Sequence, residues 1–305
     1  MTNIGSILSV VGVLIGLLVI LIYSLKGRDI DRRIIFLFIF LSVAFAIVFN
    51  IKFKETPTPI VRAVFEKIDS MPPGSKILIS FDFDPAMKPE VGPMANAFVR
   101  HCMSKGHKMY FMTLWATGHA LMTESIEEVL KTDFPDAVYG VDFTSLGFKA
   151  GGVGVLNVIV TDFQKMYPTD DNNTELSELP IFKNVNSATD MDLILAIGGG
   201  FPGPKEWIQF IGDPGNVDIA AGLAAVVAPQ IYPYYPRQVV GLLGGVKGAA
   251  EYESKLMERY PQFKDTEAPA LRMMGPQTLA HIVVMAFIVI GNISYFRSRR
   301  KNIDA

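Results

Sequence analysis

Two acidic residues end a short apolar run near the start of the central part of the chain. Residues 76–89 read KILISFDFDPAMKP, in which Asp82 and Asp84 are separated by a single residue. Side chains two positions apart on an extended strand point to the same side, so both carboxylates can face one substrate. One carboxylate can act as a nucleophile and its neighbour as a general acid or base. The spacing makes Asp82 and Asp84 candidate catalytic residues.

The D-x-D end of this run resembles the first motif of the haloacid dehalogenase superfamily. The resemblance implies a phosphoryl-accepting nucleophile at Asp82, a general acid/base at Asp84 and a phosphate contact at Thr113, which ends the next apolar run. The sequence departs from the family at Pro85 and Ala86, where the family has a small polar residue or Gly and then Thr or Val. Glycines also stand where the family's late acidic motif would complete a Mg²⁺ site. The other interpretation is that both aspartates close a strand and begin a turn.

Glycine-rich turns suggest a second kind of site. Residues 147–154, 198–203 and 244–248 each follow an apolar run and precede a predicted helix. Backbone N–H groups in such turns can hold an anion at the carboxyl ends of parallel strands. Tight strand-to-helix turns also require glycine for steric reasons alone, so packing is the alternative explanation. The candidate ligand-binding residues are Gly199, Gly200, Gly244, Gly245 and Lys247.

Other chemistries find little support in the sequence. The histidines at 101, 107, 119 and 281 form no H-E-x-x-H pair, and no G-x-S-x-G motif is present. We therefore expect no metal and no cofactor. Cys102 is the only cysteine, which excludes an intramolecular disulfide. The central region carries more acidic than basic residues, so binding to nucleic acid is not expected.

The elements that would position these residues alternate along the chain. Residues 76–83 and 108–115 have the apolar character of buried strands, and residues 90–106 and 117–134 have the pattern of helices. The series continues from residues 137–143, AVYGVDF, to the end of the central region. Such alternation predicts an α/β fold: a Rossmann-like domain with a mostly parallel sheet and helices on both faces.

Three further stretches have the length and composition of membrane helices. Half of the 305 residues are hydrophobic and 19% are charged, which is typical of a protein only partly embedded in lipid. Residues 4–25, 34–51 and 276–296 are almost free of charged side chains, and about 20 apolar residues span a bilayer. The predicted organisation is two transmembrane helices in residues 1–52, an α/β domain in 53–275 and a third span with a tail in 276–305.

The basic residues predict how the chain is oriented in the membrane. Lys and Arg beside a span favour the cytosolic side. They cluster between the first two spans and after the third, at Lys26, Arg28, Arg32 and Arg33, and at Arg297, Arg299, Arg300 and Lys301. This places the N-terminus outside, the C-terminus in the cytosol and the main domain on the extracytoplasmic side, periplasmic or at the cell surface in a bacterium.

These features together favour a non-catalytic role in a membrane assembly. Gly12 and Gly16 have the spacing of a helix-packing motif, and residues 229–237 contain three tyrosines that are candidate interface residues, Tyr232, Tyr234 and Tyr235. We expect an integral membrane protein that pairs with copies of itself or with other membrane-complex subunits, and whose domain binds protein or ligand. The alternatives are a small-ligand-binding module that uses the glycine-rich turns and an aspartate-based phosphohydrolase.

Overall fold

The computed structural model describes residues 4–26, 31–53, 55–265 and 268–303. Arg28 of the predicted basic loop and residues 304–305 of the predicted tail lie outside the described residues. The chain divides into two compact units. Residues 1–55 and 271–305 form the helical unit, and residues 56–270 form the α/β unit.

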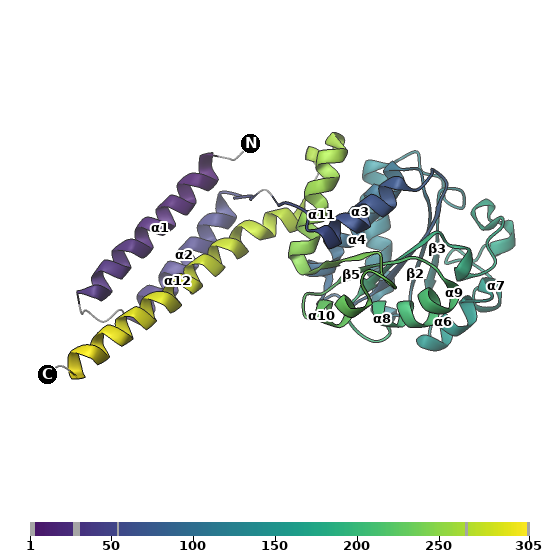
Figure 1. Cartoon of the computed structure of the whole chain (residues 1–305). Helices are drawn as coiled ribbons and strands as arrows, with labels where there is room; N and C mark the ends of the chain where they lie inside the picture. Colours follow the sequence, from purple (N-terminus) through teal and green to yellow (C-terminus); the bar gives the residue numbers. More distant parts are fainter. Residues whose placement is uncertain (1–3, 27–30, 54, 266–267, 304–305) are drawn as a thin grey trace. The chain divides into compact units, whose positions relative to one another are not determined.

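The α/β unit is built on one six-stranded sheet in which every pairing is parallel (Figure 1). The strand order is β3-β2-β1-β4-β5-β6. The strands are β1 (Lys76–Asp82), β2 (Lys108–Thr113), β3 (Phe143–Phe148), β4 (Leu193–Gly198), β5 (Ile219–Leu223) and β6 (Gly241–Gly244). The prediction of an α/β fold with a parallel sheet is confirmed.

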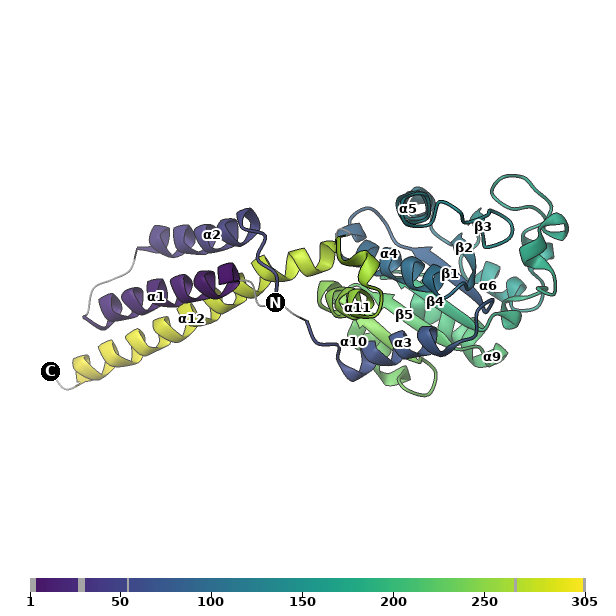
Figure 2. The same ribbon diagram turned by 90° about the horizontal axis from the view of Figure 1, so that it is seen from above.

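Helices cover both faces of this sheet (Figures 1 and 2). On one face lie α3 (Pro59–Ser70), α4 (Lys88–Ser104), α5 (Ala116–Ile126) and α11 (Gly245–Arg259). On the other lie the shorter helices α6 (Val153–Ile159), α7 (Phe163–Met166), α8 (Pro204–Trp207), α9 (Asp213–Gly215) and α10 (Ala228–Ile231). Because helices cover both faces, β1 and β4 are buried along almost their whole length.

The third strand begins later than the sequence predicted. The run at 137–143 forms a turn with one isolated bridge, between Tyr139 and Phe143, and β3 starts at Phe143. Asp142 explains the turn, because its carboxylate accepts hydrogen bonds from the Val138 N–H and from the Lys108 ammonium group. The polar segment at 168–190 is also ordered, with short 3₁₀ turns at Leu176–Glu178, Pro180–Phe182 and Ala188–Asp190.

The helical unit contains α1 (Ile4–Leu25), α2 (Arg32–Val48) and α12 (Pro269–Ile303), which run side by side in both views (Figures 1 and 2). Val13 and Leu17 of α1, Ala46 of α2 and Leu279 and Val283 of α12 form its buried core. The ring of Phe38 on α2 meets the edge of the Phe287 ring on α12 at 6.0 Å between centroids.

Among the described residues, only one helix is long and apolar enough to cross a membrane, from Pro269 to Arg297 within α12. The sequence predicted three such spans. The predicted second span, 34–51, is cut short because α2 ends at Val48 and Asn50 has a left-handed backbone conformation with φ of 46°. Its 17 residues reach about 26 Å, less than the roughly 30 Å of a hydrocarbon core. In α1 the apolar stretch found among the described residues is Val11–Tyr23.

Candidate functional site

The strand order reverses between β1 and β4, which are neighbours although β2 and β3 separate them in the chain. Open parallel sheets bind ligands in the crevice at the carboxyl ends of the strands where such a reversal occurs. Asp82 and Gly198 are register partners at this point. The candidate site is therefore the edge formed by the carboxyl ends of β1 and β4 and the turns that follow them.

Asp82 lies at the centre of this edge with none of its surface exposed to solvent. The backbone N–H of Leu114 donates to Oδ1 at 2.7 Å, the indole Nε1–H of Trp207 donates to Oδ2 at 2.7 Å, and the Ser80 hydroxyl also donates to Oδ2. Burial raises the pKa of Asp82 to about 6, although these hydrogen bonds favour the ionised form and oppose the rise. The carboxylate joins β1 to the end of β2 and to α8.

Asp84 and Thr113, the other two candidate catalytic residues, form hydrogen bonds with backbone groups. Because β1 ends at Asp82, Asp84 falls in the following turn, where its Oδ1 accepts from the Met87 N–H at 3.1 Å. The Thr113 hydroxyl donates to the carbonyl of Phe81 at 2.6 Å and accepts from the Trp115 N–H at 3.0 Å. The three candidates thus share one edge of the sheet, but the recorded hydrogen bonds do not join Asp84 or Thr113 to the Asp82 carboxylate.

Side chains of the chain itself fill the turn that follows β4. A Cβ atom on Gly199 would lie 2.8 Å from the sulfur of Met87, and one on Gly200 would collide with the indole ring of Trp115. The Trp115 Nε1–H donates to the carbonyl of Pro202 at 2.8 Å, which holds the ring over the turn. In this conformation, Gly199 and Gly200 make room for two side chains.

The turn between β6 and α11 is occupied by a carboxylate. Gly245 has φ of 62°, and a Cβ atom there would lie 2.8 Å from Oε1 of Glu90. That Glu90 oxygen accepts a hydrogen bond from the Ala225 N–H at 2.7 Å. The Lys247 ammonium group lies 3.0 Å from a Glu251 oxygen one turn along α11. A negative charge already present beside Gly244 and Gly245 disfavours an anionic ligand at this turn.

The loops after β4 and β5 expose apolar side chains. Phe201 is 70% exposed and Val226 is 84% exposed, and both lie three residues beyond the paired positions Gly198 and Leu223. Tyr232 is also exposed, and its hydroxyl lies near Gly244 at the end of β6. We call Phe201, Val226 and Tyr232 the apolar rim; Phe201 follows β4, and Val226 and Tyr232 both follow β5.

Of the other predicted interface residues, all but Gly12 are more buried than the rim. Tyr234 and Tyr235 are half-buried, and the Tyr234 hydroxyl accepts from the Gln209 amide at 2.9 Å. In α1, a Cβ atom on Gly16 would collide with the ring of Phe38 from α2, so Gly16 serves packing within the chain. Gly12 is exposed and has open space around its Cα.

One polar pair at this edge was not predicted from the sequence. Nε2 of His119, near the start of α5, lies 2.7 Å from Oδ2 of Asp171, and the Ser145 hydroxyl donates to the same oxygen at 3.2 Å. The serine bonds to the aspartate rather than to the histidine, so the group lacks the serine–histidine contact of an activated nucleophile. His119 and Asp171 are 52 positions apart, which leaves no spacing signal by which the pair could be found.

The remaining histidine of note is buried. His101 on α4 hydrogen-bonds to the Tyr252 hydroxyl on α11 at 2.6 Å and stacks on the ring of Phe65. Burial lowers the pKa of His101 to about 3, so the ring is neutral at physiological pH. No group of three or more His, Cys, Asp or Glu side chains suitable for a metal ion occurs in the described part of the chain.

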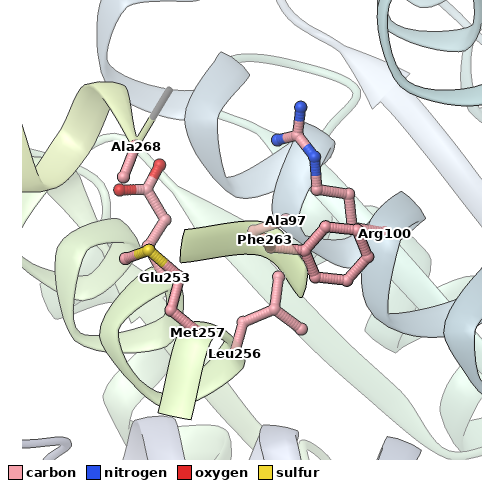
Figure 3. A pocket seen from close by; sticks show the side chains of 7 residues that line it. All are labelled: Ala97, Arg100, Glu253, Leu256, Met257, Phe263 and Ala268. Carbon is pink, nitrogen blue, oxygen red and sulfur yellow. The ribbon is translucent and has the colours of Figure 1, made fainter. Parts of the chain in front are cut away.

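Three hollows in the described part of the α/β unit lie away from the reversal point. One, with a volume of about 20 Å³, is lined by side chains of α4, α11 and the segment before α12, among them Arg100 and Glu253 (Figure 3). It has room for about one water molecule. Two open hollows of about 300 and 350 Å³ lie at the opposite edge of the sheet and share Asp192, the residue before β4.

Comparison of the chain with protein-family models, with curated proteins and with solved structures gave no significant match.

Proposed function

We propose that the protein is a membrane-anchored, non-catalytic subunit whose α/β unit binds another protein through the carboxyl edge of its sheet. One observation carries this proposal: Met87, Trp115 and Glu90 occupy the turns after β4 and β6 at that edge, while the apolar rim is exposed. A small ligand needs a concave, open site, whereas a protein partner needs exposed apolar side chains at the centre of a contact surface.

The surroundings of Asp82 support a structural role for this residue. A phosphoryl-accepting carboxylate must offer a free oxygen to the substrate, and the Asp82 oxygens are buried and already accept three hydrogen bonds. Moving this carboxylate toward a substrate would leave the indole of Trp207 and the N–H of Leu114 without acceptors, which is unfavourable in a buried site.

The surface of the helical unit supports membrane anchoring. Large apolar side chains face outward from all three helices, for example Ile15 on α1, Phe40 on α2 and Ile288 on α12, each more than half exposed. Soluble proteins rarely expose apolar patches of this extent. With the basic residues beside α1, α2 and α12 in the cytosol, the α/β unit would lie on the extracytoplasmic side.

The proposal can be tested by placing a photo-crosslinking amino acid at single positions of the full chain in its native membrane. We expect crosslinks from Val226 and Phe201 of the apolar rim to a discrete protein partner. The matched control is Val138, which is equally apolar and 52% exposed but precedes β3 at the opposite edge of the sheet. Equal crosslinking at Val138 and Val226, or none at either rim position, would argue against the docking role.

A catalytic assay gives a second, independent readout. The non-catalytic proposal expects no Mg²⁺-dependent phosphatase activity in the purified protein. Activity that disappears on the substitution Asp82→Asn would replace the proposal by the phosphohydrolase alternative.

A further inference from the structure

The apolar segment of α12 carries its polar side chains on the outside of the helical unit. Leu279, Val283 and Ile290 are buried against α1 and α2, whereas His281 and Asn292 are exposed. They are 11 residues apart, and at about 100° per residue their directions differ by about 20°. If the helical unit were surrounded by lipid alone, His281 and Asn292 would be expected to face its interior, because polar groups within a bilayer face protein or water.

The exposed face has the spacing of a coiled-coil seam. His281, Met285, Ile288, Asn292 and Tyr295 are separated alternately by four and three residues, and all five are exposed. This spacing places Met285 and Asn292 at a positions and the other three at d positions of a heptad. An asparagine at an a position fixes register and favours two strands in parallel coiled coils.

We propose that this seam of α12 pairs with the same seam of a second copy of the chain, as a parallel dimer within the membrane. The inference rests on the membrane anchoring proposed above and adds the partner of the helical unit.

A second copy fits the seam better than an unrelated helix for a geometric reason. Two copies inserted by the same distribution of basic residues have the same orientation, so their α12 helices run parallel and each residue meets its counterpart at equal depth. The amide of Asn292 donates to the carbonyl of Ile288 at 2.8 Å, which uses one of its two N–H groups. Because a carboxamide is both donor and acceptor, Asn292 can complete its hydrogen bonds with the Asn292 of the other copy. A different partner would have to supply polar groups at both depths.

The test is disulfide crosslinking of single-cysteine substitutions in the full chain in membranes. Cys102 is buried and gives little background. We expect a crosslinked homodimer from Ile288→Cys and Met285→Cys. The matched controls are Val289→Cys and Ile293→Cys, which are exposed on the same helix but point about 70° to 110° away from the seam, and these should give severalfold less dimer.

A second substitution tests the role of the asparagine. In the Ile288→Cys background, Asn292→Leu should weaken pairing about tenfold, whereas Val289→Leu should leave it unchanged. If Asn292→Leu crosslinks as well as Val289→Leu, Asn292 does not belong to the contact.

The outcomes separate this inference from the proposed anchoring. If the protein resists alkaline extraction from membranes but Ile288→Cys and Ile293→Cys give equal dimer or none, the paired seam is wrong and the anchoring stands. A crosslink from Ile288→Cys to a different protein also overturns the homodimer. Release by alkaline extraction contradicts both.

Discussion

The indole N–H of Trp207 donates a hydrogen bond to the carboxylate of Asp82 at 2.7 Å, across 125 positions of sequence. Trp207 ends α8, and Asp82 ends β1, so this bond fastens a helix of one face of the sheet to the strand at the reversal point. Both side chains have no exposed surface. The bond occupies an oxygen of the carboxylate that a sheet of this topology would otherwise present to a ligand at the reversal point.

The raised pKa of Asp82 predicts a specific dependence of stability on pH. The folded-state pKa is about 6, against 3.8 for an unperturbed aspartate, so the folded state binds the proton more tightly than the unfolded state. The stabilising effect of protonation is fully present below about pH 4 and is lost as the pH rises through 6, which amounts to about 3 kcal/mol of unfolding free energy. The substitution Asp82→Asn should remove this decrease.

The measurement is denaturant unfolding of the full chain in detergent at pH 4, 5, 6 and 7, followed by tryptophan fluorescence. Trp115 and Trp207 are the two tryptophans of the chain, and both lie in the α/β unit. The control is Asp84→Asn, which alters a turn residue and should keep the decrease. Parallel pH profiles for the wild type and Asp82→Asn would show that Asp82 ionises normally.

Two glycines that look alike in the sequence should respond in opposite ways to alanine. A Cβ atom on Gly118 of α5 would collide with the carbonyl oxygen of Phe81 and the hydroxyl of Thr113, so the helix would have to move away from β1. We expect Gly118→Ala to lower the free energy of unfolding by about 2 kcal/mol. Gly154 of α6 is exposed with open space around it, and Gly154→Ala should raise stability by about 0.5 kcal/mol. Thermal unfolding of both variants checks the signs.

The strands of the sheet could be predicted from the sequence because local patterns determine them. Runs such as the one at β4 are apolar at every position, which is typical of a strand covered on both faces. The third strand was misplaced because AVYGVDF is equally apolar, but the hydrogen bond from Val138 to Asp142 turns the chain there. The end of α2 was missed for a similar reason: the left-handed conformation of Asn50 interrupts a run that remains apolar.

The residues of the candidate site could be found from the sequence, but their surroundings could not. Asp82 was selected by its place at the end of a strand, whereas its partner Trp207 is distant in sequence and carries no motif. The sequence indicated the turn glycines as candidate anion contacts, with close packing as the alternative, but not which groups lie against them. Trp115 and Glu90 occupy the turns only because the topology brings their helices to that edge.

A buried ion pair in the α/β unit should contribute strongly to its stability. Nε of Arg100 on α4 lies 2.6 Å from Oδ2 of Asp133, and the two side chains are 10% and 12% exposed. Arg100→Met would leave Asp133 buried without its partner, and we expect a loss of about 3 kcal/mol in unfolding free energy. The double substitution Arg100→Met/Asp133→Leu should recover most of this loss, because it removes both charges.

The control for this pair is an exposed one nearby. Lys131 and Glu127 are 2.7 Å apart, but both side chains are more than half exposed. Lys131→Met should change stability by less than about 0.5 kcal/mol. Equal effects of Arg100→Met and Lys131→Met in the same unfolding assay would show that the burial of the Arg100 pair has no energetic weight.

The proposed orientation in the membrane predicts which thiols a reagent can reach from outside. Val226→Cys places a thiol on an 84% exposed residue of the α/β unit, and Arg299→Cys places one among the basic residues after the apolar part of α12. A membrane-impermeant maleimide should label Val226→Cys in spheroplasts or intact cells and Arg299→Cys only after lysis, because basic residues beside a span stay in the cytosol. Cys102 provides an internal blank: it is fully buried, and burial raises the pKa of its thiol, so little reactive thiolate is present at neutral pH. Labelling of Arg299→Cys before lysis and of Val226→Cys only after it would reverse the orientation and move the apolar rim, with any partner it binds, into the cytosol.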